Sequence, residues 1–286
     1  MKHLFQISCL VVFLAGTGTV RLIQSSARDQ VPTSAPLMTD SPGQTGGVAA
    51  ISVFRVVCPH KRLGGSAFLH KSGKVITAAH IVAGCEPNDV ILITAKGKPV
   101  KIDKIVIDSD VDLALLTPQS PLSGNCLVIS SDSKFGIGSQ ICMWGYPTGY
   151  TSGTPLLSVG YFAGVDSVKM PSGKIAKRWV VNAAVNLGNS GGPLVCVESG
   201  KVMGVVSSKL APMPEYIESA LAALKQNKTI TVFKRIKPDG SAERLSTGQV
   251  VEEVLQYLRS QTQLVIGHTV VLGDLRGFLK ANGIDP

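Results

Sequence analysis

The chain has 286 residues, a formal net charge of +9 and only 5% aromatic residues. This length suffices for one mid-sized domain with a leader and an insertion. The basic residues are dispersed, and few aromatic side chains are available to stack bases, so we exclude a nucleic-acid partner. We attribute the charge mainly to solubility, with weak binding to anionic surfaces left open.

Residues 1–27 are predicted to be a targeting segment. A weakly basic start precedes a mostly apolar run over 4–20, and Ser25-Ser26-Ala27 offers a small-residue cleavage site. The run suits a signal peptide and is short for a membrane span. We therefore expect a secreted or periplasmic protein. The alternative is an uncleaved membrane anchor, because Arg21 follows the run directly.

Residues 28–47, rich in Pro, Ser, Thr and Gly, predict a flexible linker. From residue 48 onward, short β-branched runs between turn signals predict an all-β domain that ends at 286. The expected strands are 49–57, 66–70, 75–77, 90–94, 113–116, 139–144, 155–165 and 179–182. Hairpin loops are expected at Ser72-Gly73, Lys96-Gly97 and Ser172-Gly173. The sequence has no βαβ alternation and no phosphate loop, and we expect no cofactor.

His80 ends the run Lys74–His80, which predicts a short apolar strand closing in small residues. A general base must titrate near neutrality and keep one ring nitrogen free, which suits a histidine in this place. The remaining histidines lie in the leader, beside the first strand or in a late strand (His3, His60, His70 and His268). A lone histidine at a strand end is more often structural.

Asp112 directly precedes the apolar run Leu113–Leu116. A carboxylate in this place becomes partly buried and needs a partner, and an imidazole N–H is a suitable one. Asp110 is the second candidate. The alternative interpretation is a solvated acidic turn that contains Asp108, Asp110 and Asp112.

Ser190 stands within Gly188-Asn189-Ser190-Gly191-Gly192-Pro193. Glycines permit turn conformations that a side chain would forbid and allow a substrate carbonyl to approach the main chain. Backbone amides of such a turn can bind an oxyanion. Alone, the hexapeptide also fits an ordinary turn before a strand. A base and an acid upstream favour a nucleophilic Ser190 instead.

Three motifs, Thr77–His80, Asp112–Leu116 and Gly188–Leu194, resemble those of the trypsin-like serine peptidases in order and spacing. The chain is most similar to the HtrA (Deg) branch, because Asn189 precedes the serine and Ala183-Ala184-Val185-Asn186 leads into it. The resemblance spans about 49–210 and resumes near 263. It implies a chymotrypsin-like fold of two six-stranded β-barrels with the site between them. It also implies a serine endopeptidase that works through an acyl-enzyme.

The resemblance implies a role for each site residue. Ser190 would attack, His80 would transfer the proton, and Asp112 would orient the imidazole. The oxyanion would lie at Gly188, Asn189 and Ser190. Substrate binding would involve Ala184, at the base of the primary pocket, and Val206, Ser207 and Ser208, on a strand that pairs with substrate. An uncharged Ala184 favours small or medium apolar side chains. Because the uncharged Asn189 cannot pair with a freed N-terminus, we expect no activating cut.

Five cysteines lie beyond the leader. The pair Cys142–Cys196 resembles a disulfide shared by many trypsin-like enzymes. A Cys58–Cys85 bridge would hold the loop that carries His80. Cys126 would then be buried as a small hydrophobe or free. The alternative is that all five stay reduced, as in the cytosol. No Cys/His spacing suggests zinc, and we expect no metal.

An insertion, 211–262, separates the substrate-pairing strand from a last strand over 266–272. We expect it to be mainly helical, with a helix opened by Pro214, a strand over 229–236 that ends at a Pro238-Asp239-Gly240 turn, and a second amphipathic helix over 250–258. It would brace the barrel or act as a lid. A final helix, capped by Asp274, would end near Gly283, and no PDZ domain follows.

The expected partners are protein or peptide substrates, and a membrane only if the leader stays uncleaved. The sequence does not indicate the oligomeric state. The second functional hypothesis is a catalytically silent, protease-like binding protein.

Overall fold

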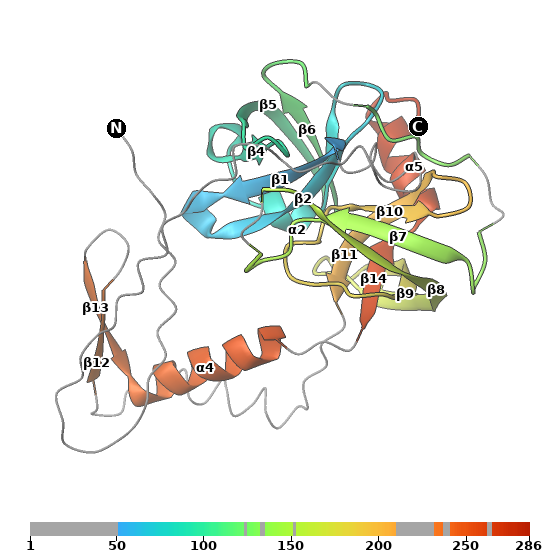
Figure 1. Cartoon of the computed structure of the whole chain (residues 1–286). Helices are drawn as coiled ribbons and strands as arrows, with labels where there is room; N and C mark the ends of the chain where they lie inside the picture. Colours follow the sequence, from blue (N-terminus) through green and yellow to red (C-terminus); the bar gives the residue numbers. More distant parts are fainter. Residues whose placement is uncertain are drawn as a thin grey trace. The chain divides into compact units, whose positions relative to one another are not determined.

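The computed structural model describes residues 51–122, 125–131, 135–150, 153–209, 232–236, 241–261 and 265–286 (Figure 1). The predicted leader and linker, the helix after Pro214 and the Pro238 turn lie outside these residues. The chain divides into two compact units. One contains the described residues of 51–209 and 260–286, and the other contains the described residues of 232–259.

The first unit contains two closed antiparallel barrels. The strands of the first barrel are β1 (Val53–Cys58), β2 (Leu63–Leu69), β3 (Val75–Thr77), β4 (Ile91–Ile93), β5 (Pro99–Asp108) and β6 (Leu113–Pro118). They close in the order β1-β2-β3-β6-β5-β4. Its short helices are η1 (Pro59–Lys61), α2 (Ala79–Val82) and η2 (Pro87–Asp89). Alternating side chains such as Phe54, Val56 and Leu92 fill its interior.

The strands of the second barrel are β7 (Gln140–Gly145), β8 (Leu156–Lys169), β9 (Ile175–Asn182), β10 (Pro193–Cys196), β11 (Val202–Lys209) and β14 (Ile266–Val270). They close in the order β10-β11-β14-β9-β8-β7. Ile141, Met143 and Phe162 are among the residues that fill the interior. The prediction of two six-stranded barrels is therefore confirmed.

A third cluster of buried residues joins the two barrels. It contains Phe68 and Leu115 from the first barrel, Val195 and Val205 from the second, and Phe278 from α5 (Leu272–Ala281). Because the barrels share a core, residues from both can be held in one fixed arrangement at the junction.

Two strands were not predicted, and the start of one helix was predicted wrongly. β5 was missed because its lysines and aspartates interrupt the alternation and a bulge lies between Ile102 and Lys104. β10 was missed because it has only four residues and begins with a proline. Helix α5 begins at Leu272 with Val271 as its N-cap, so Asp274 lies in the first turn rather than at the cap.

The described part of the other unit contains a hairpin and most of a helix. β12 (Val232–Ile236) pairs with β13 (Ala242–Ser246), and α4 (Thr247–Gln261) follows directly. Ser246 and Gln249 begin the helix with a capping box: the Gln249 side chain accepts from Ser246 N at 2.7 Å, and Ser246 Oγ accepts from Gln249 N at 3.3 Å. The second amphipathic helix is confirmed. β12 lies within the strand predicted over 229–236, whereas its partner β13 was not predicted. Within the described residues, no helix is long and apolar enough to cross a membrane.

Candidate active site

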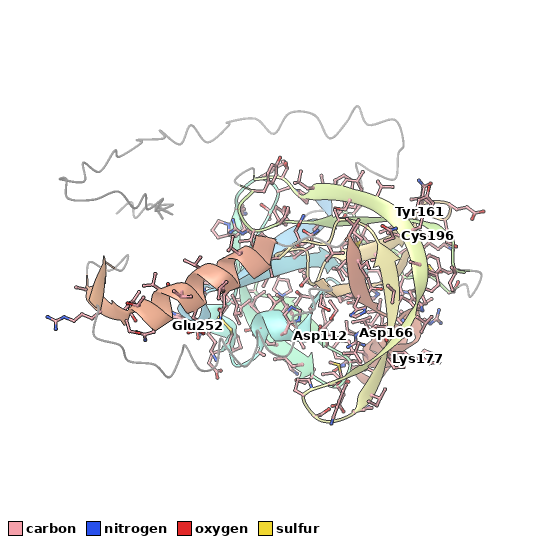
Figure 2. All side chains as sticks on the ribbon, turned by 90° about the horizontal axis from the view of Figure 1, so that it is seen from below. Asp112, Tyr161, Asp166, Lys177, Cys196 and Glu252 are labelled. Carbon is pink, nitrogen blue, oxygen red and sulfur yellow. A yellow bond between two sulfur atoms is a disulfide. The ribbon has the colours of Figure 1, made fainter. Side chains whose placement is uncertain are left out.

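His80 and Asp112 meet on the first barrel. The histidine lies in α2, immediately after β3, rather than at the end of the strand as predicted. Asp112, labelled in Figure 2, directly precedes β6 and is 6% exposed. The two atoms His80 Nδ1 and Asp112 Oδ1 lie 3.0 Å apart, and Oδ1 also accepts from the His80 backbone N–H at 3.0 Å. A carboxylate only accepts, so the proton of His80 belongs on Nδ1 and leaves Nε2 as a free acceptor.

Asp110 lies apart from this pair. Its carboxylate faces Lys174 Nζ at 3.6 Å. A hydrogen bond from Ser172 lowers the pKa of Asp110, with a smaller contribution from Lys174. The geometry therefore favours Asp112 over Asp110 as the partner of His80.

Ser207 is a third member of the cluster that the sequence reasoning assigned to another role. From β11 in the second barrel, its hydroxyl donates to Asp112 Oδ2 at 2.5 Å. The predicted role was pairing with substrate. The sequence held one signal for the observed role, because Ser207 directly follows the run Val202–Val206. A serine that is buried with such a run requires a hydrogen-bond partner for its hydroxyl.

Ser190 occupies a turn whose shape depends on glycine. Gly188 and Gly191 have φ values of 93° and 85°, in the left-handed region. A Cβ on either residue would collide with a carbonyl oxygen, that of Tyr146 or that of Ser66. These two positions therefore require glycine for both conformation and close approach.

Ser66 holds this turn against the first barrel, a role that sequence reasoning missed. Its backbone N–H donates to Ser190 O at 2.8 Å, and its hydroxyl donates to Gly188 O at 2.6 Å. The same hydroxyl accepts from Tyr146 N at 2.9 Å. The fully buried Ser66 side chain thus links β2 to the loop that precedes β10.

The Ser190 hydroxyl donates to the backbone carbonyl of Ser207 at 2.7 Å. Within the described residues, no hydrogen bond joins it to His80. A hydroxyl has one proton to donate, so transfer to His80 requires this proton to leave the Ser207 carbonyl first.

Two amides of the turn are available to a ligand. In the described part of the chain, the N–H groups of Gly188 and Ser190 have no protein acceptor, whereas Asn189 N donates to Asn186 O at 3.0 Å. The Asn189 side chain is 3% exposed, its Nδ2 lies 3.5 Å from Ala184 O, and its buried Oδ1 has no hydrogen-bond partner. Gly188 and Ser190, not Asn189, supply the free donors.

Ala184 lies on the segment that follows β9. Its side chain is exposed, and its carbonyl accepts from Ser158 Oγ at 2.9 Å. Val206 does not fit the predicted substrate-pairing role. Its N–H donates to Gly192 O at 2.9 Å and its carbonyl accepts from Gly191 N at 2.7 Å, so both backbone groups are occupied. Ser208 remains exposed on the same strand.

One predicted disulfide is present and the other is wrong. Cys58 and Cys85 form a bridge between β1 and the segment after α2. Cys142 and Cys196 are free, as is the exposed Cys126. Cys142 lies opposite Val195 in the β7–β10 pairing, so Cys196, one residue further, points to the other face of the sheet. Burial raises the pKa of Cys142 to about 11, with a smaller effect of Cys196.

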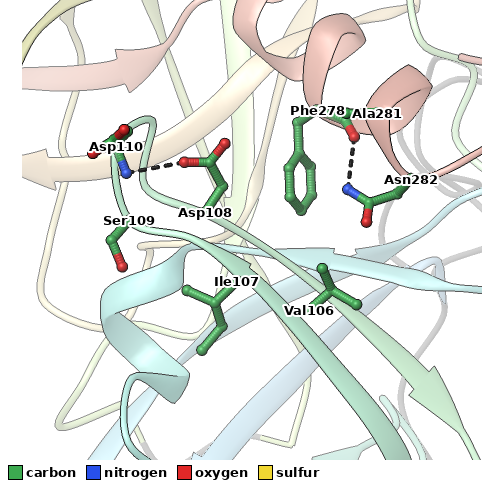
Figure 3. Close-up of a pocket in the computed structure, with 8 residues that line it drawn as sticks. All are labelled: Val106, Ile107, Asp108, Ser109, Asp110, Phe278, Ala281 and Asn282. Carbon is green, nitrogen blue, oxygen red and sulfur yellow. Dashed lines mark hydrogen bonds between the residues drawn. The ribbon is translucent and has the colours of Figure 1, made fainter.

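A surface cavity of about 370 Å³ lies elsewhere (Figure 3). The end of β5 and the end of α5 line it, with Asp108, Asp110, Phe278 and Asn282 among its residues. None of the Ser190, His80 and Asp112 side chains lines this cavity. It is therefore separate from the candidate site.

Comparison with known proteins finds similarity to trypsin-like peptidases over much of the chain. Residues 65–205 match the model of the trypsin-like peptidase domain. The chain is 26% identical over 197 residues to "Serine protease Do-like HtrA" of Lactococcus lactis subsp. lactis, covering 66% of this chain and 46% of the relative. It is 27% identical over 224 residues to "Probable periplasmic serine endoprotease DegP-like" of Rickettsia prowazekii, covering 77% and 42%. The chain thus spans less than half of either relative.

Among solved structures, the chain is similar to the protease Rv3671c of Mycobacterium tuberculosis. The inactive form superposes with a TM-score of 0.55 at 20% identity, covering 88% of this chain and 98% of that one. The active form gives a TM-score of 0.51 at 21% identity, covering 82% and 93%. At this identity the likeness supports the two-barrel fold alone.

Proposed function

Because the chain contains a trypsin-like peptidase domain and is distantly homologous to the HtrA/DegP serine proteases, we propose that it is a serine endopeptidase with Ser190 as nucleophile. The observation that carries the proposal is the pair His80–Asp112, in which a buried carboxylate holds Nδ1 at 3.0 Å. This arrangement leaves Nε2 able to take a proton from a neighbouring hydroxyl.

The reaction follows from these groups. His80 Nε2 removes the proton of Ser190, and Oγ attacks the substrate carbonyl carbon. Asp112 stabilises the imidazolium that forms, and the free amides of Gly188 and Ser190 stabilise the oxyanion. The imidazolium then protonates the leaving amine. Water, activated by the same nitrogen, hydrolyses the acyl-enzyme and regenerates Ser190.

Specificity is proposed for small or medium apolar residues before the scissile bond. Ala184, predicted at the base of the primary pocket, brings no charge to select basic or acidic side chains. The exposed Ser208 and the carbonyl of Ser207 are the parts of β11 proposed to contact extended substrate.

The protein is proposed to act outside the cytoplasm, with 1–27 as a signal peptide or anchor, 28–47 as a linker and 48–286 as the peptidase domain. The Cys58–Cys85 disulfide supports an oxidising compartment. The insertion 211–262 is proposed as a brace or a lid, and Asn189 as the reason that no activating cut is needed.

One observation favours the second candidate, a silent binding protein. The Ser190 hydroxyl is bonded to the Ser207 carbonyl rather than to His80. Digestion of an unfolded protein and of a peptide library, read by mass spectrometry, distinguishes the two candidates. Cleavage that Ser190→Ala abolishes and that the exposed-site control Ser167→Ala retains supports the peptidase. Peptides retained intact by a folded wild-type protein would support the binding protein.

A further inference from the structure

Arg178 is a buried cation that the mechanism above does not use. It lies on β9 of the second barrel, is 2% exposed, and is among the largest fully buried side chains of the described chain. Removing a guanidinium from water is costly unless its hydrogen bonds and its charge are compensated nearby. Its surroundings therefore indicate what it does.

All the hydrogen bonds that the structure gives this guanidinium end on neutral acceptors. Nη1 donates to Lys177 O at 3.0 Å. Nη2 donates to Val111 O at 3.1 Å and lies 3.3 Å from Met170 Sδ. Within the described residues no carboxylate lies within ion-pair distance of it. Burial lowers the pKa of Arg178, and the charges of Asp112 and Asp274 oppose this effect.

The Val111 contact is important because the next residue is Asp112. Asp112 has φ of 64°, a left-handed conformation that is unfavourable for residues with a side chain. Its carboxylate is held by His80 and Ser207. The peptide that precedes it is held by Arg178, which reaches across from the other barrel. Asp112 is thus fixed at both its backbone and its side chain.

We propose that Arg178 is a positioning residue for the His80–Asp112 pair: through the Val111 carbonyl it holds Asp112 in its left-handed conformation, and it places a buried positive charge near the Asp112 carboxylate. This inference rests on the proposed peptidase function. It adds Arg178, a residue of the second barrel, to the residues that position His80, the proposed general base on the first barrel. Arg178 lies on β9, which pairs with β8.

Other charges near Arg178 act on the same region. Asp274 lies on α5, and burial raises its pKa, whereas Arg178 and Lys174 lower it. Lys174 pairs with Asp110, which lies in the loop between β5 and β6. Asp108 is the last residue of β5, and Lys177 precedes Arg178 in β9. Asp166 is paired with His268 at 3.2 Å. Arg178 is the buried cation of this set, so its charge is the least screened by solvent.

A positive charge near Asp112 opposes protonation of the pair. Its loss therefore moves the acid limb of the pH profile to higher pH. Loss of the Val111 hydrogen bond instead slows the reaction at every pH, because Asp112 is less well positioned. Arg178→Met removes both effects. Arg178→Lys retains the charge but not the planar pair of donors.

The rate constant of labelling by a fluorophosphonate probe, measured from pH 5 to 9 on folded full-length protein, separates these effects. We expect Arg178→Met to label about 10-fold more slowly, with its acid midpoint about 0.5 pH units higher. Arg178→Lys should keep the wild-type midpoint and label several-fold more slowly. Lys177→Met is the matched control, because it removes one exposed charge next to Arg178 and should leave both values unchanged.

If Arg178→Met labels at the wild-type rate and has the wild-type acid midpoint, the inference is overturned. A slow Arg178→Met with an unshifted midpoint would also overturn it, because a merely structural role predicts that result. If Arg178→Met does not fold, Arg178→Lys decides: labelling at the wild-type rate contradicts the role of the Val111 hydrogen bond. A wild-type protein that does not label refutes the proposed function itself, which distinguishes that failure from this one.

Discussion

The hydroxyl of Ser207 donates a 2.5 Å hydrogen bond to Asp112 Oδ2, while the carbonyl of the same residue accepts the proton of the Ser190 hydroxyl. One residue of β11 therefore contacts both the acid and the nucleophile of the candidate site. It orients Asp112 from the second barrel, and it holds Ser190 in a conformation that the reaction must release.

Replacing Ser207 with alanine should weaken the orientation of Asp112 and leave the carbonyl of residue 207 in place. The buried carboxylate loses one charge-assisted hydrogen bond. We expect kcat/KM for a peptide substrate to fall about 10-fold. Ser167→Ala, which changes an exposed serine of β8, is the control and should retain activity. Equal activity of the two variants would contradict the role of the Ser207 hydroxyl.

Asn189→Asp should destabilise the protein. The side chain is 3% exposed, its Oδ1 has no partner, and no ion pair to a described cation would compensate a carboxylate there. We expect thermal unfolding at pH 8 several degrees lower than in the wild type, with a smaller difference at pH 5, because protonation makes the new carboxyl neutral like the amide.

The exposed Asn186→Asp in the same loop is the control, and its unfolding temperature should stay near that of the wild type. An Asn189→Asp protein as stable as the wild type would mean that a cation reaches this position. That result would count against an enzyme that needs no activating N-terminus.

His70 should make stability depend on pH. Burial lowers the pKa of His70 from 6.5, with a smaller effect of Lys71. Its Nδ1 accepts from Ser72 N at 3.2 Å, and its Nε2 is buried without a partner. The unfolded chain therefore takes up a proton at a higher pH than the folded chain does. The contribution of neutral His70 is present above pH 6.5 and is lost as the pH falls below that value.

Urea unfolding of the wild type and of His70→Asn between pH 7.5 and 5 measures this effect. The asparagine oxygen can replace Nδ1 as an acceptor and does not titrate in this range. The free energy of unfolding of the wild type should fall more steeply below pH 6.5 than that of the variant. Parallel curves would show that His70 is not the responsible group.

Removing the Cys58–Cys85 disulfide should loosen the segment that carries His80. The two cysteines are separated by 27 residues, and closing a loop of this size contributes about 3.5 kcal/mol to the free energy of unfolding. Cys58→Ala/Cys85→Ala should lose stability of this order and label more slowly with a fluorophosphonate. Cys126→Ala, which removes a free exposed thiol, is the control. Peptide mapping that joined Cys142 to Cys196 would contradict the register of β7 and β10.

Features defined by local patterns could be predicted from the sequence. Gly73, Gly97 and Gly173, in the predicted hairpin turns, all have positive φ, a conformation for which such turns favour glycine. The order of the three motifs indicated the two barrels, and the residue directly before a buried run indicated Asp112. Each of these signals is local, because it occupies only a few consecutive residues of the chain.

Features that depend on contacts between distant strands could not be predicted in the same way. The roles of Ser66, Ser207 and Arg178 arise from contacts 122, 95 and 67 residues away in the sequence. The free state of Cys142 depends on a register of one residue between β7 and β10. Neither composition nor periodicity contains this information, because it is fixed only when the strands pair.

Reaction with a fluorophosphonate probe, followed by intact mass and peptide mapping, tests the central claim most directly. A nucleophilic Ser190 predicts one adduct per chain, located on the peptide that contains Ser190 and absent from folded His80→Ala and Ser190→Ala proteins. A folded wild-type protein that forms no adduct, or one whose adduct lies on another residue, would contradict the assignment of Ser190, His80 and Asp112.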